Sequence, residues 1–304
     1  MSSVLERLPS GSRVAVIRLR SLGDCVLSTP AIHLLKQYRP DLKLSVVVEP
    51  QFIPLFEENP DIDDIIVPSI PLLRRWRPDL SLNLHGGTRS LLLTTGSLAR
   101  FRAGFSHYRY SLAYNVRIPR AQEILGEERT VHTAEHAASA MFHLGVPRTD
   151  IPRALLYSSR RRRANRYAVV HPYASAAEKA WPARRFLEVV EFLEKALKLE
   201  PIIIGGPGDD PAPFKPWPVE IFSDLNKTKS LLASASLFFG NDSGPAHMAA
   251  AFGVPVAVLY GPSDSTIWAP WRVESQVISS PTGIDKITTT QAVEAVAKLK
   301  VLSQ

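Results

Sequence analysis

The sequence of 304 residues has a single cysteine, Cys25, which excludes an internal disulfide bond and argues against a thiolate metal site. It also has no long apolar run. The longest weakly polar stretch, residues 249–260, is about twelve residues long against the ~18 of a membrane-spanning helix, and Gly253 and Pro255 interrupt it. Residues 1–13 are polar and lack the apolar segment of a signal peptide. We therefore expect a cytoplasmic protein.

The glycine fingerprint of dinucleotide-binding domains is absent as well. Neither the turn at Gly23 nor the run GGPG at residues 205–208 has the spacing Gly-x-Gly-x-x-Gly. This absence argues against an NAD-dependent enzyme.

Positive charge is concentrated in the first half of the chain. Residues 1–163 contain 23 Lys and Arg against 15 Asp and Glu, and 21 of the 23 are Arg, whereas residues 164–304 contain 13 against 14. The planar guanidinium group suits bidentate contacts with carboxylates and phosphates. The first half is thus expected to meet an acidic partner, and the composition leaves open anionic lipid head groups, a phosphorylated glycan or nucleic acid. A generally Arg-rich composition without such a partner is the other interpretation.

Short β-branched runs alternate with helical patterns through both halves, which predicts an α/β fold with parallel sheets covered on both faces. Strands are expected at residues 14–19, 44–48, 65–67, 80–84, 167–170, 201–205, 219–222, 237–240 and 255–260. Helices are expected at residues 24–38, 89–100, 134–144, 183–197 and 245–252.

A charged and polar stretch at residues 158–165 separates the two halves. We interpret residues 1–157 as a first Rossmann-like domain, 158–166 as a linker and 167–286 as a second Rossmann-like domain. Residues 287–304 contain a final amphipathic helix with no strand after it, and its pattern allows packing on either domain.

Ligands of doubly wound sheets bind beyond the carboxyl ends of the strands. That rule points to four turns, at residues 20–24 and 85–88 in the first domain and at residues 172–179 and 241–247 in the second. Each domain thus has its own pair of turns that could bind a ligand. Two binding sites of this kind suggest transfer of a group between two substrates.

Asp24 follows Gly23 in the first of these turns, where a helix opens. A carboxylate at this place is either the N-cap of the helix or a base that accepts a proton from a bound hydroxyl. The local pattern leaves both interpretations open.

The run GNDSGPAH at residues 240–247 joins an expected strand to an expected helix. Unpaired amides at such a helix start attract phosphate, and the amides of Ser243, Gly244 and Ala246 are the ones expected to do so. Lys179 can neutralise the same anion. Asp242 is an unexpected carboxylate here, and capping of the turn by its own hydrogen bonds is one explanation of it.

Three motifs together resemble the signature of glycosyltransferase family 9, the ADP-heptose:lipopolysaccharide heptosyltransferases. They are the run RLRSLGD at residues 18–24 continued by Thr29-Pro30-Ala31, the run KAWP at residues 179–182, and the run GNDSGPAHMAAA at residues 240–251 followed by Pro255 and GPSD at residues 261–264. They stand in the order of that family and span residues 14–264.

The resemblance implies a GT-B architecture, in which two Rossmann-like domains face each other across a cleft and the C-terminal helix returns to the first domain. It implies that the second domain binds ADP-heptose and that the first binds an acidic lipopolysaccharide core. It further implies inverting transfer with Asp24 as general base and a peripheral position on the anionic inner face of the inner membrane. It implies no nucleic acid partner, no required cofactor and no divalent metal in the site.

The resemblance also suggests the binding residues. The donor and its phosphates are expected to contact Ser175 (or its neighbour Ala174), Lys179, Asp209, Asp242, Ser243, Gly244, Pro245 and His247, although a histidine at such a position is more often structural. The acceptor is expected to contact residues among Arg18, Arg20, the cluster of Arg74, Arg75 and Arg77, Arg89, Arg117 and His132, although each arginine taken alone is more often a solvated surface charge.

Two alternatives stay open. No residue in the motifs determines which sugar is bound, so a family-9 transferase for another nucleotide sugar or glycan acceptor fits the motifs too. A non-catalytic sugar-nucleotide-binding protein is the alternative of another class, and Asp24 argues against it.

Overall fold

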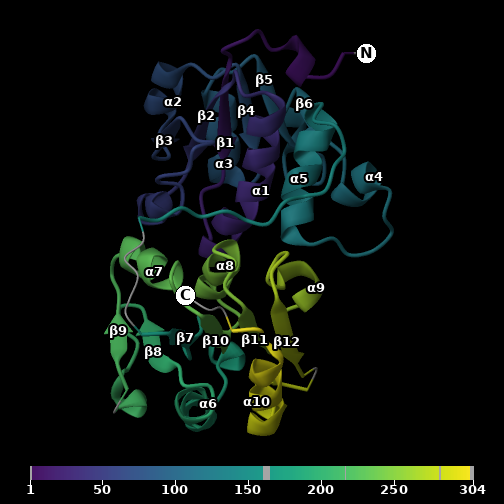
Figure 1. Cartoon of the computed structure of the whole chain (residues 1–304). Helices are drawn as coiled ribbons and strands as arrows, with labels where there is room; N and C mark the ends of the chain where they lie inside the picture. Colours follow the sequence, from purple (N-terminus) through teal and green to yellow (C-terminus); the bar gives the residue numbers. More distant parts are fainter. Residues whose placement is uncertain (1, 160–164, 216, 281, 302–304) are drawn as a thin grey trace. The chain divides into compact units, whose positions relative to one another are not determined.

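The computed structural model describes residues 2–159, 165–215, 217–280 and 282–301. The chain divides between Leu155 and Leu156 into two compact units, each built on one sheet with helices around it (Figure 1). The predicted linker, residues 158–166, begins just after this division, and residues 160–164 of it lie outside the described part of the chain.

The first unit contains a parallel sheet of six strands in the order β3-β2-β1-β4-β5-β6. The strands are β1 (Arg13–Ile17), β2 (Lys43–Val47), β3 (Asp64–Ile66), β4 (Leu80–Asn83), β5 (Phe101–Phe105) and β6 (Val116–Ile118). The helices are α1 (Leu22–Tyr38), α2 (Ile70–Trp76), α3 (Thr88–Gly96), α4 (Ala121–Leu125) and α5 (Thr133–Leu144), with 3-10 helices η1 (Leu5–Arg7), η2 (Pro50–Leu55) and η3 (Ser111–Ala113).

The second unit repeats this plan with a parallel sheet in the order β9-β8-β7-β10-β11-β12. The strands are β7 (Tyr167–His171), β8 (Glu200–Gly205), β9 (Val219–Ile221), β10 (Leu237–Asn241), β11 (Val256–Tyr260) and β12 (Ser275–Ser279). The helices are α6 (Ala183–Lys195), α7 (Leu225–Leu232), α8 (Gly244–Ala251), α9 (Ser265–Trp268) and α10 (Thr289–Lys298), with η4 (Ala177–Lys179), η5 (Ala212–Phe214) and η6 (Ile284–Lys286).

Each sheet has the strand order of a doubly wound Rossmann-like fold, which confirms the predicted fold class. The strands form because they are short apolar runs buried on both faces. In β1, Ala15 and Ile17 belong to one apolar cluster with Leu73 of α2 and Leu93 of α3. Alternate residues of a strand face opposite sides, so the intervening residues of β1 point to the other face, where α1 packs against α5.

The sequence pattern does not predict three of the strands, β5, β6 and β12. Strand β5 contains Arg102 and Gly104, which break the apolar run, and β6 is a three-residue edge strand. Strand β12 is an edge strand in which polar and apolar residues are partly exposed. An edge strand has a neighbouring strand on one side only, so its residues are less buried than those of the central strands. Its sequence is therefore less apolar and harder to recognise as a strand.

The last helix packs on the second unit. Ala292 and Val296 of α10 and the following Leu299 belong to the same buried cluster as Val190 of α6 and Leu259 of β11. The described part of the C-terminal helix therefore takes one of the two positions that its pattern allowed, and the expected return to the first domain is wrong for these residues. The reason is that its apolar stripe is already covered by α6 and the second sheet.

No helix in the described part of the chain combines the length and the apolar character that crossing a membrane requires.

Candidate active site

The candidate site residues gather where the strand order of each sheet reverses. In the first unit this point lies between β1 and β4, and in the second between β7 and β10. The loops that follow such a pair of strands diverge to opposite faces and leave a crevice at the carboxyl edge. The first pair leads to Asp24 and His85, and the second leads to Lys179 and Ser243.

Asp24 lies in the first turn of α1 and not at the N-cap, which is Ser21. Its Oδ2 accepts hydrogen bonds from the backbone amide of Ser21 at 3.4 Å and from the Ser21 hydroxyl at 3.1 Å. Of the two interpretations of Asp24, the N-cap is therefore wrong, because the cap lies three residues earlier at Ser21. The helix-end field favours a negative charge at this place, and the side chain remains 21% exposed, so the carboxylate is reachable.

Arg18 forms an ion pair with the other carboxylate oxygen of Asp24. A second guanidinium nitrogen of Arg18 donates to the carbonyl of Leu84 at the end of β4, and only 12% of the side chain is exposed. Burial lowers the pKa of the Arg18 guanidinium. Arg18 was predicted to bind the acceptor, and its main contact in the structure is with Asp24.

Cys25 stands beside Asp24 and is buried below the site. Its thiol lies 3.7 Å from the carbonyl oxygen of Arg18, and burial raises its pKa to about 12. The only thiol of the chain is therefore protonated and structural.

The end of β4 supplies His85, whose Nδ1 donates to the carbonyl of Arg20 at 3.1 Å. Burial and the nearby Arg18 lower the pKa of His85, so its ring is neutral at pH 7. The backbone of Arg20 thus belongs to the crevice, and its side chain is exposed there. Arg89, in the first turn of α3, pairs with Glu49 at 2.8 Å and keeps 61% of its side chain exposed.

Several residues of this edge were not predicted. Tyr108 donates from its hydroxyl to the carbonyl of Leu84 at 3.2 Å, and the ring of His136 stacks on Phe105 at 4.0 Å between centroids. Burial holds the pKa of His136 at about 4. These residues follow or contact β5, the strand that the sequence pattern misses.

His132 is buried at the amino end of α5, at the same edge of the sheet as His136. Its Nδ1 accepts a hydrogen bond from the amide of Ala134 at 3.1 Å, so it serves as the N-cap of the helix. The structure thus gives His132 a structural role that the acceptor prediction did not include.

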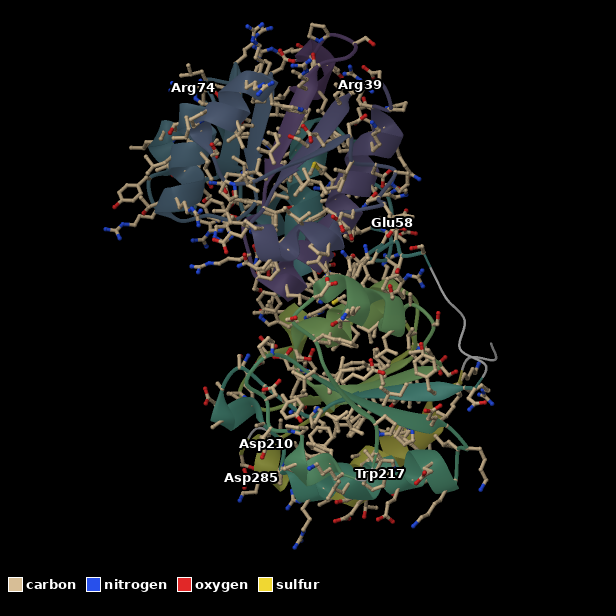
Figure 2. All side chains as sticks on the ribbon, turned by 90° about the vertical axis from the view of Figure 1, so that its left-hand side faces the viewer. Arg39, Glu58, Arg74, Asp210, Trp217 and Asp285 are labelled. Carbon is tan, nitrogen blue, oxygen red and sulfur yellow. The ribbon has the colours of Figure 1, made fainter. Side chains whose placement is uncertain are left out.

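Arg74 and Arg77 are not brought to this crevice. Arg74 donates to the carbonyl of Gly96 at 2.8 Å, and Arg77 ends α2 just before the amino end of β4. Figure 2 places Arg74 at the same end of the first unit as Arg39, which follows the last turn of α1, whereas Asp24 is in its first turn. For these two arginines the acceptor assignment fails, because α2 ends at the amino edge of the sheet.

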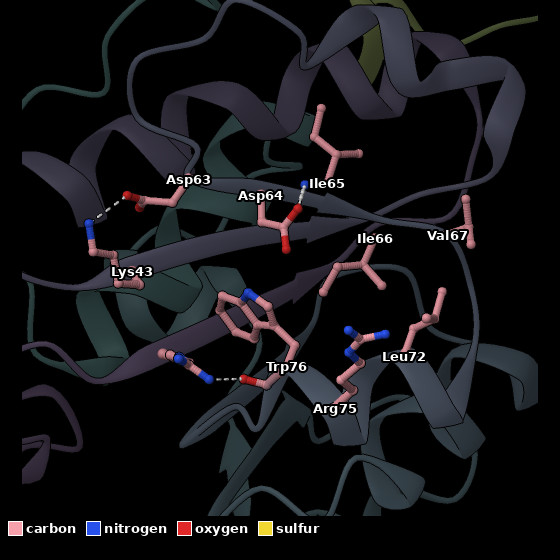
Figure 3. Close-up of a pocket in the computed structure, with 10 residues that line it drawn as sticks. Lys43, Asp63, Asp64, Ile65, Ile66, Val67, Leu72, Arg75 and Trp76 are labelled. Carbon is pink, nitrogen blue, oxygen red and sulfur yellow. Dashed lines mark hydrogen bonds and ion pairs between the residues drawn. The ribbon is translucent and has the colours of Figure 1, made fainter.

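A pocket of about 640 Å³ lies beside α2 at the outer edge of the first sheet, and Arg75, one of the acceptor candidates, lines it (Figure 3). Its wall combines the apolar β3 edge and the Trp76 indole with charged groups: Arg13, Lys43, Asp63, Asp64 and Arg75. Most of these charges are already engaged, because Lys43 pairs with Asp63 at 3.1 Å and Arg13 donates to the carbonyl of Trp76 at 2.6 Å.

In the second unit, Lys179 ends the short helix η4 in the long connection between β7 and α6. Three contacts hold this connection in place. The Asn241 side chain accepts a hydrogen bond from the amide of Trp181 at 3.2 Å and donates to the carbonyl of Pro172 at 2.7 Å. A Cβ on Gly261 would lie 2.7 Å from the carbonyl oxygen of Glu178, so only glycine allows this approach.

The Lys179 ammonium lies 3.4 Å from Asp242 Oδ2. Asp242 follows β10 directly, and 11% of its side chain is exposed. The carboxylate that looked out of place in the sequence is therefore the partner of the lysine predicted to bind phosphate, and it holds the ammonium over the start of α8.

The start of α8 presents several hydrogen-bond donors that have no acceptor in the described part of the chain. They are the amides of Ser243 and Gly244 and the hydroxyl of Ser243, which is buried. The hydroxyl of Ser263, after the neighbouring strand β11, is buried and unpartnered too. A buried donor without an acceptor costs about 1–3 kcal/mol, and an anion with several oxygens would satisfy the donors at the start of α8.

Pro245 lies at the second position of α8, as expected for a residue without an amide hydrogen. The Ala246 amide donates to the carbonyl of Ser243 at 3.2 Å, so the prediction that it faces a phosphate is wrong. His247 is buried within the same helix, which agrees with a structural histidine. Ser175 is exposed in the connection before η4.

Asp209 follows β8, and its Oδ2 accepts a hydrogen bond from the amide of Gly206 at 2.8 Å. It also lines a cavity of about 420 Å³ together with Tyr173, Trp181 and Phe214. This cavity adjoins the Lys179 connection, so Asp209 and Lys179 belong to the same edge of the sheet. In the described part of the chain, no three His, Cys, Asp or Glu side chains gather as they would around a metal ion.

The comparisons with known proteins follow this geometry. A family model described as glycosyltransferase family 9 (heptosyltransferase) matches residues 71–296. Lipopolysaccharide heptosyltransferase 3 of Escherichia coli K12 is 27% identical over 296 residues, which cover 83% of each chain.

Solved structures agree on the fold. The glycosyltransferase of family 9 from Veillonella parvula matches with a TM-score of 0.82 at 22% identity, over 94% of this chain and 96% of that one. The E. coli heptosyltransferase WaaC, solved with ADP, matches with a TM-score of 0.78 at 19% identity, over 94% and 99%. The family match begins after Asp24 but includes Lys179 and the turn after β10, and it covers most of the chain. The chain is therefore a glycosyltransferase and belongs to glycosyltransferase family 9.

Proposed function

We propose that this protein is an inverting heptosyltransferase that moves heptose from ADP-heptose to the inner core of lipopolysaccharide, with Asp24 as the general base. Its relatives support the substrates: one is a lipopolysaccharide heptosyltransferase, and WaaC was solved with ADP and with ADP-2-deoxy-2-fluoro heptose. The observation that carries the proposal is the set of unsatisfied donors at Ser243, Gly244 and Ser263 on two neighbouring strand ends, together with the Lys179 ammonium that pairs with the adjacent Asp242.

The donor half of the reaction needs a place for a diphosphate. Two amides and the Ser243 hydroxyl supply hydrogen bonds at the start of α8, where the helix field adds about 0.3–2 kcal/mol. The Ser263 hydroxyl after β11 and the Lys179 ammonium supply a further hydrogen bond and positive charge. Asp242 is close enough to Lys179 to keep it in position when the site is empty of donor. We place the sugar hydroxyls near Asp242, whose carboxylate can accept hydrogen bonds from them, and the nucleoside in the cavity beside Asp209.

The acceptor half needs a base. In the proposed step, the acceptor oxygen bonds to the anomeric carbon as the bond from that carbon to the diphosphate oxygen breaks. Asp24 takes the hydroxyl proton, and ADP leaves with the electron pair of the broken bond on the face opposite the attack, which inverts the configuration. The Asp24 carboxylate is 21% exposed, so a hydroxyl can reach it.

Arg18 affects this base in two ways. Its ion pair with Asp24, together with the Ser21 hydrogen bonds, fixes the orientation of the carboxylate. The same positive charge stabilises the ionised form and so weakens it as a proton acceptor. We infer that proton transfer is completed only as the new carbon–oxygen bond forms, when the hydroxyl has become acidic.

A panel of nucleotide sugars tests the proposal most directly. ADP-heptose should raise the thermal unfolding temperature and support transfer to a de-lipidated lipopolysaccharide core, whereas UDP- and GDP-sugars should do neither. A preference for UDP or GDP would favour the alternative of a family-9 transferase with another donor. Binding of ADP-heptose without any transfer would favour a non-catalytic sugar-nucleotide-binding protein.

We also propose that the reaction needs no cofactor and no divalent metal, because Lys179 and the α8 end supply the positive charge that a metal supplies elsewhere. Transfer should keep its rate in excess EDTA. A rate that falls with EDTA and returns with added Mg²⁺ would overturn this part of the proposal.

The cellular place proposed for this activity is the inner face of the inner membrane, with peripheral and salt-sensitive binding. The support is the excess of arginine in residues 1–163, since basic segments bind anionic bilayers through charge and lose affinity as salt rises. Binding to anionic vesicles that does not change with ionic strength would contradict it.

A further inference from the structure

The segment after β5, residues 106–115, forms a loop that the proposed reaction does not use. We call it the tyrosine loop, because it contains Tyr108, Tyr110 and Tyr114. Its middle is the short helix η3, and it begins at the carboxyl edge of the first sheet, the edge that carries Asp24.

Two of the three tyrosines anchor this loop. The Tyr108 hydroxyl donates to the carbonyl of Leu84, and its ring lies against Gly86, where a Cβ would be 3.2 Å away. The Tyr114 hydroxyl accepts a hydrogen bond from the Asn83 side chain at 2.8 Å. Its ring fills the space over Gly104, where a Cβ would lie 2.5 Å from it. The ends of the loop are thus fixed to β4 and β5.

Between these anchors the loop exposes apolar side chains. Leu112 is 84% exposed and Tyr110 is 50% exposed, whereas Tyr114 is 4% exposed. Arg109 stacks on the Tyr110 ring, with its guanidinium carbon 4.9 Å from the ring centroid. Exposing a leucine and a tyrosine next to each other on a fixed loop is costly in water, so the tip has the character of a contact surface.

The charged side chains of the loop and of the segment after it, through residue 120, are all positive. Residues 106–120 include Arg109, Arg117 and Arg120 and no Asp or Glu. All three arginines are exposed, and Arg120 is close enough to His107 to help lower the pKa of that histidine, after burial. An apolar tip with a tyrosine and with basic residues flanking it in the chain is complementary to the head-group region of an anionic bilayer.

We propose that the tip of the tyrosine loop, Arg109 to Ala113, inserts into the head-group region of an anionic membrane. This inference rests on the proposed function, since it names the surface by which an enzyme with a lipid-linked acceptor meets the bilayer. Leu112 decides between a bilayer and a glycan, because its side chain can form no hydrogen bond to a sugar hydroxyl and gains only from apolar surroundings. The position of the loop brings that contact to the edge that carries Asp24.

Vesicle co-sedimentation tests the tip directly. The full chain is mixed with vesicles of phosphatidylglycerol and phosphatidylethanolamine, or with vesicles of phosphatidylcholine alone. The wild-type should sediment with the anionic vesicles only. The double variant Tyr110→Ser/Leu112→Ser should bind them about tenfold more weakly or worse. The variant Leu98→Ser, which removes a 69% exposed leucine after α3, is the matched control and should bind like the wild-type.

A second pair of variants tests the charge. Arg109→Gln should weaken anionic vesicle binding about fivefold and reduce its salt dependence, whereas Arg77→Gln, at the opposite edge of the sheet, should change neither. Wild-type-like binding of the double variant, or equal binding to both kinds of vesicle, would overturn the proposal.

Transfer to a de-lipidated, water-soluble core separates this proposal from the proposed function. The double variant should keep wild-type transfer to that acceptor, and its thermal unfolding should match that of the wild-type. A loss of transfer with an intact fold would mean that the tip binds the glycan and would overturn the membrane assignment. An inactive wild-type would overturn the proposed function and leave the vesicle result standing.

Discussion

The two units share one strand order but differ in the connection that follows the first strand of each. In the first unit, residues 18–21 lead from β1 into α1 at once, so Asp24 falls in the first helical turn. In the second unit, residues 172–182 separate β7 from α6 and contain η4 with Lys179. A short connection places a side chain at a helix end, where the field favours a carboxylate, and a long one can carry a cation to the neighbouring helix. One topology thus places a carboxylate in the first unit and an ammonium in the second through a difference in loop length.

Removing the base should have the largest effect. Asp24→Asn keeps the size of the side chain but removes the proton acceptor, so we expect kcat to fall roughly 10²–10⁴-fold. Calorimetry should give an ADP affinity within about twofold of the wild-type value, because ADP is proposed to bind the other unit. Asp64→Asn, an exposed carboxylate on β3, serves as the control. Wild-type turnover of Asp24→Asn would refute the assignment.

Removing the cation of the other unit should lower ADP affinity as well as turnover. Lys179→Gln is expected to lower ADP affinity and kcat together, each by about 10–100-fold, because a charged hydrogen bond to the diphosphate is lost. Lys195→Gln removes a lysine that is 71% exposed in the same unit and should change neither quantity. If Lys179→Gln bound ADP like the wild-type, the diphosphate would have to lie elsewhere.

The buried hydroxyls of Ser243 and Ser263, which have no hydrogen-bond partner, allow a finer test of the proposed ADP site. Ser243→Ala and Ser263→Ala should each lower ADP affinity about fivefold, since each removes one hydrogen bond. The free protein should be equally or more stable after either change, because the lost hydroxyl was buried without a partner. Ser280→Ala removes a hydroxyl that already bonds to Thr282 and should not alter ADP binding. A loss of stability in Ser243→Ala would show that its hydroxyl has a structural partner.

Each unit also holds a histidine whose ionisation strongly opposes folding, His136 in the first and His171 in the second. Burial holds the pKa of His136 and of His171 at about 4, below the usual 6.5. The unfolded chain therefore binds more protons between pH 6.5 and 4, and the free energy of unfolding should fall as pH falls through that window, on the order of 1–3 kcal/mol per histidine. Urea unfolding at pH 7, 6 and 5 measures this slope. His136→Phe should flatten it, and an unchanged slope would mean that His136 is accessible to protons in the folded state.

Much of the fold could be predicted from the sequence, because the central strands are apolar runs and the helices between them have a clear period. The strands that the sequence did not predict lack a continuous apolar run. Strand β5 contains Arg102 and Gly104, and the glycine is there because the Tyr114 ring occupies the space of a side chain. A contact between residues ten apart in the chain is not visible as a period.

The sequence predicts which residues of the site follow strand ends, but it does not predict which side chains contact each other. Asp24 and Lys179 stand at strand ends, where the topology alone suggests a ligand. The ion pairs Arg18–Asp24 and Lys179–Asp242 depend on side-chain directions in space, and so does the location of Arg74 and Arg77 at the wrong edge of the sheet. A cluster of arginines in the sequence indicates charge but does not indicate which end of a helix will carry it.

The single thiol of the chain has a practical consequence. Because Cys25 is buried, and burial raises its pKa to about 12, it should not react with maleimides under native conditions. A cysteine introduced on the surface of each unit could then be labelled selectively in the wild-type background, without removing the native one. A fluorophore or spin-label pair would then report whether the distance between the two units changes when ADP is added.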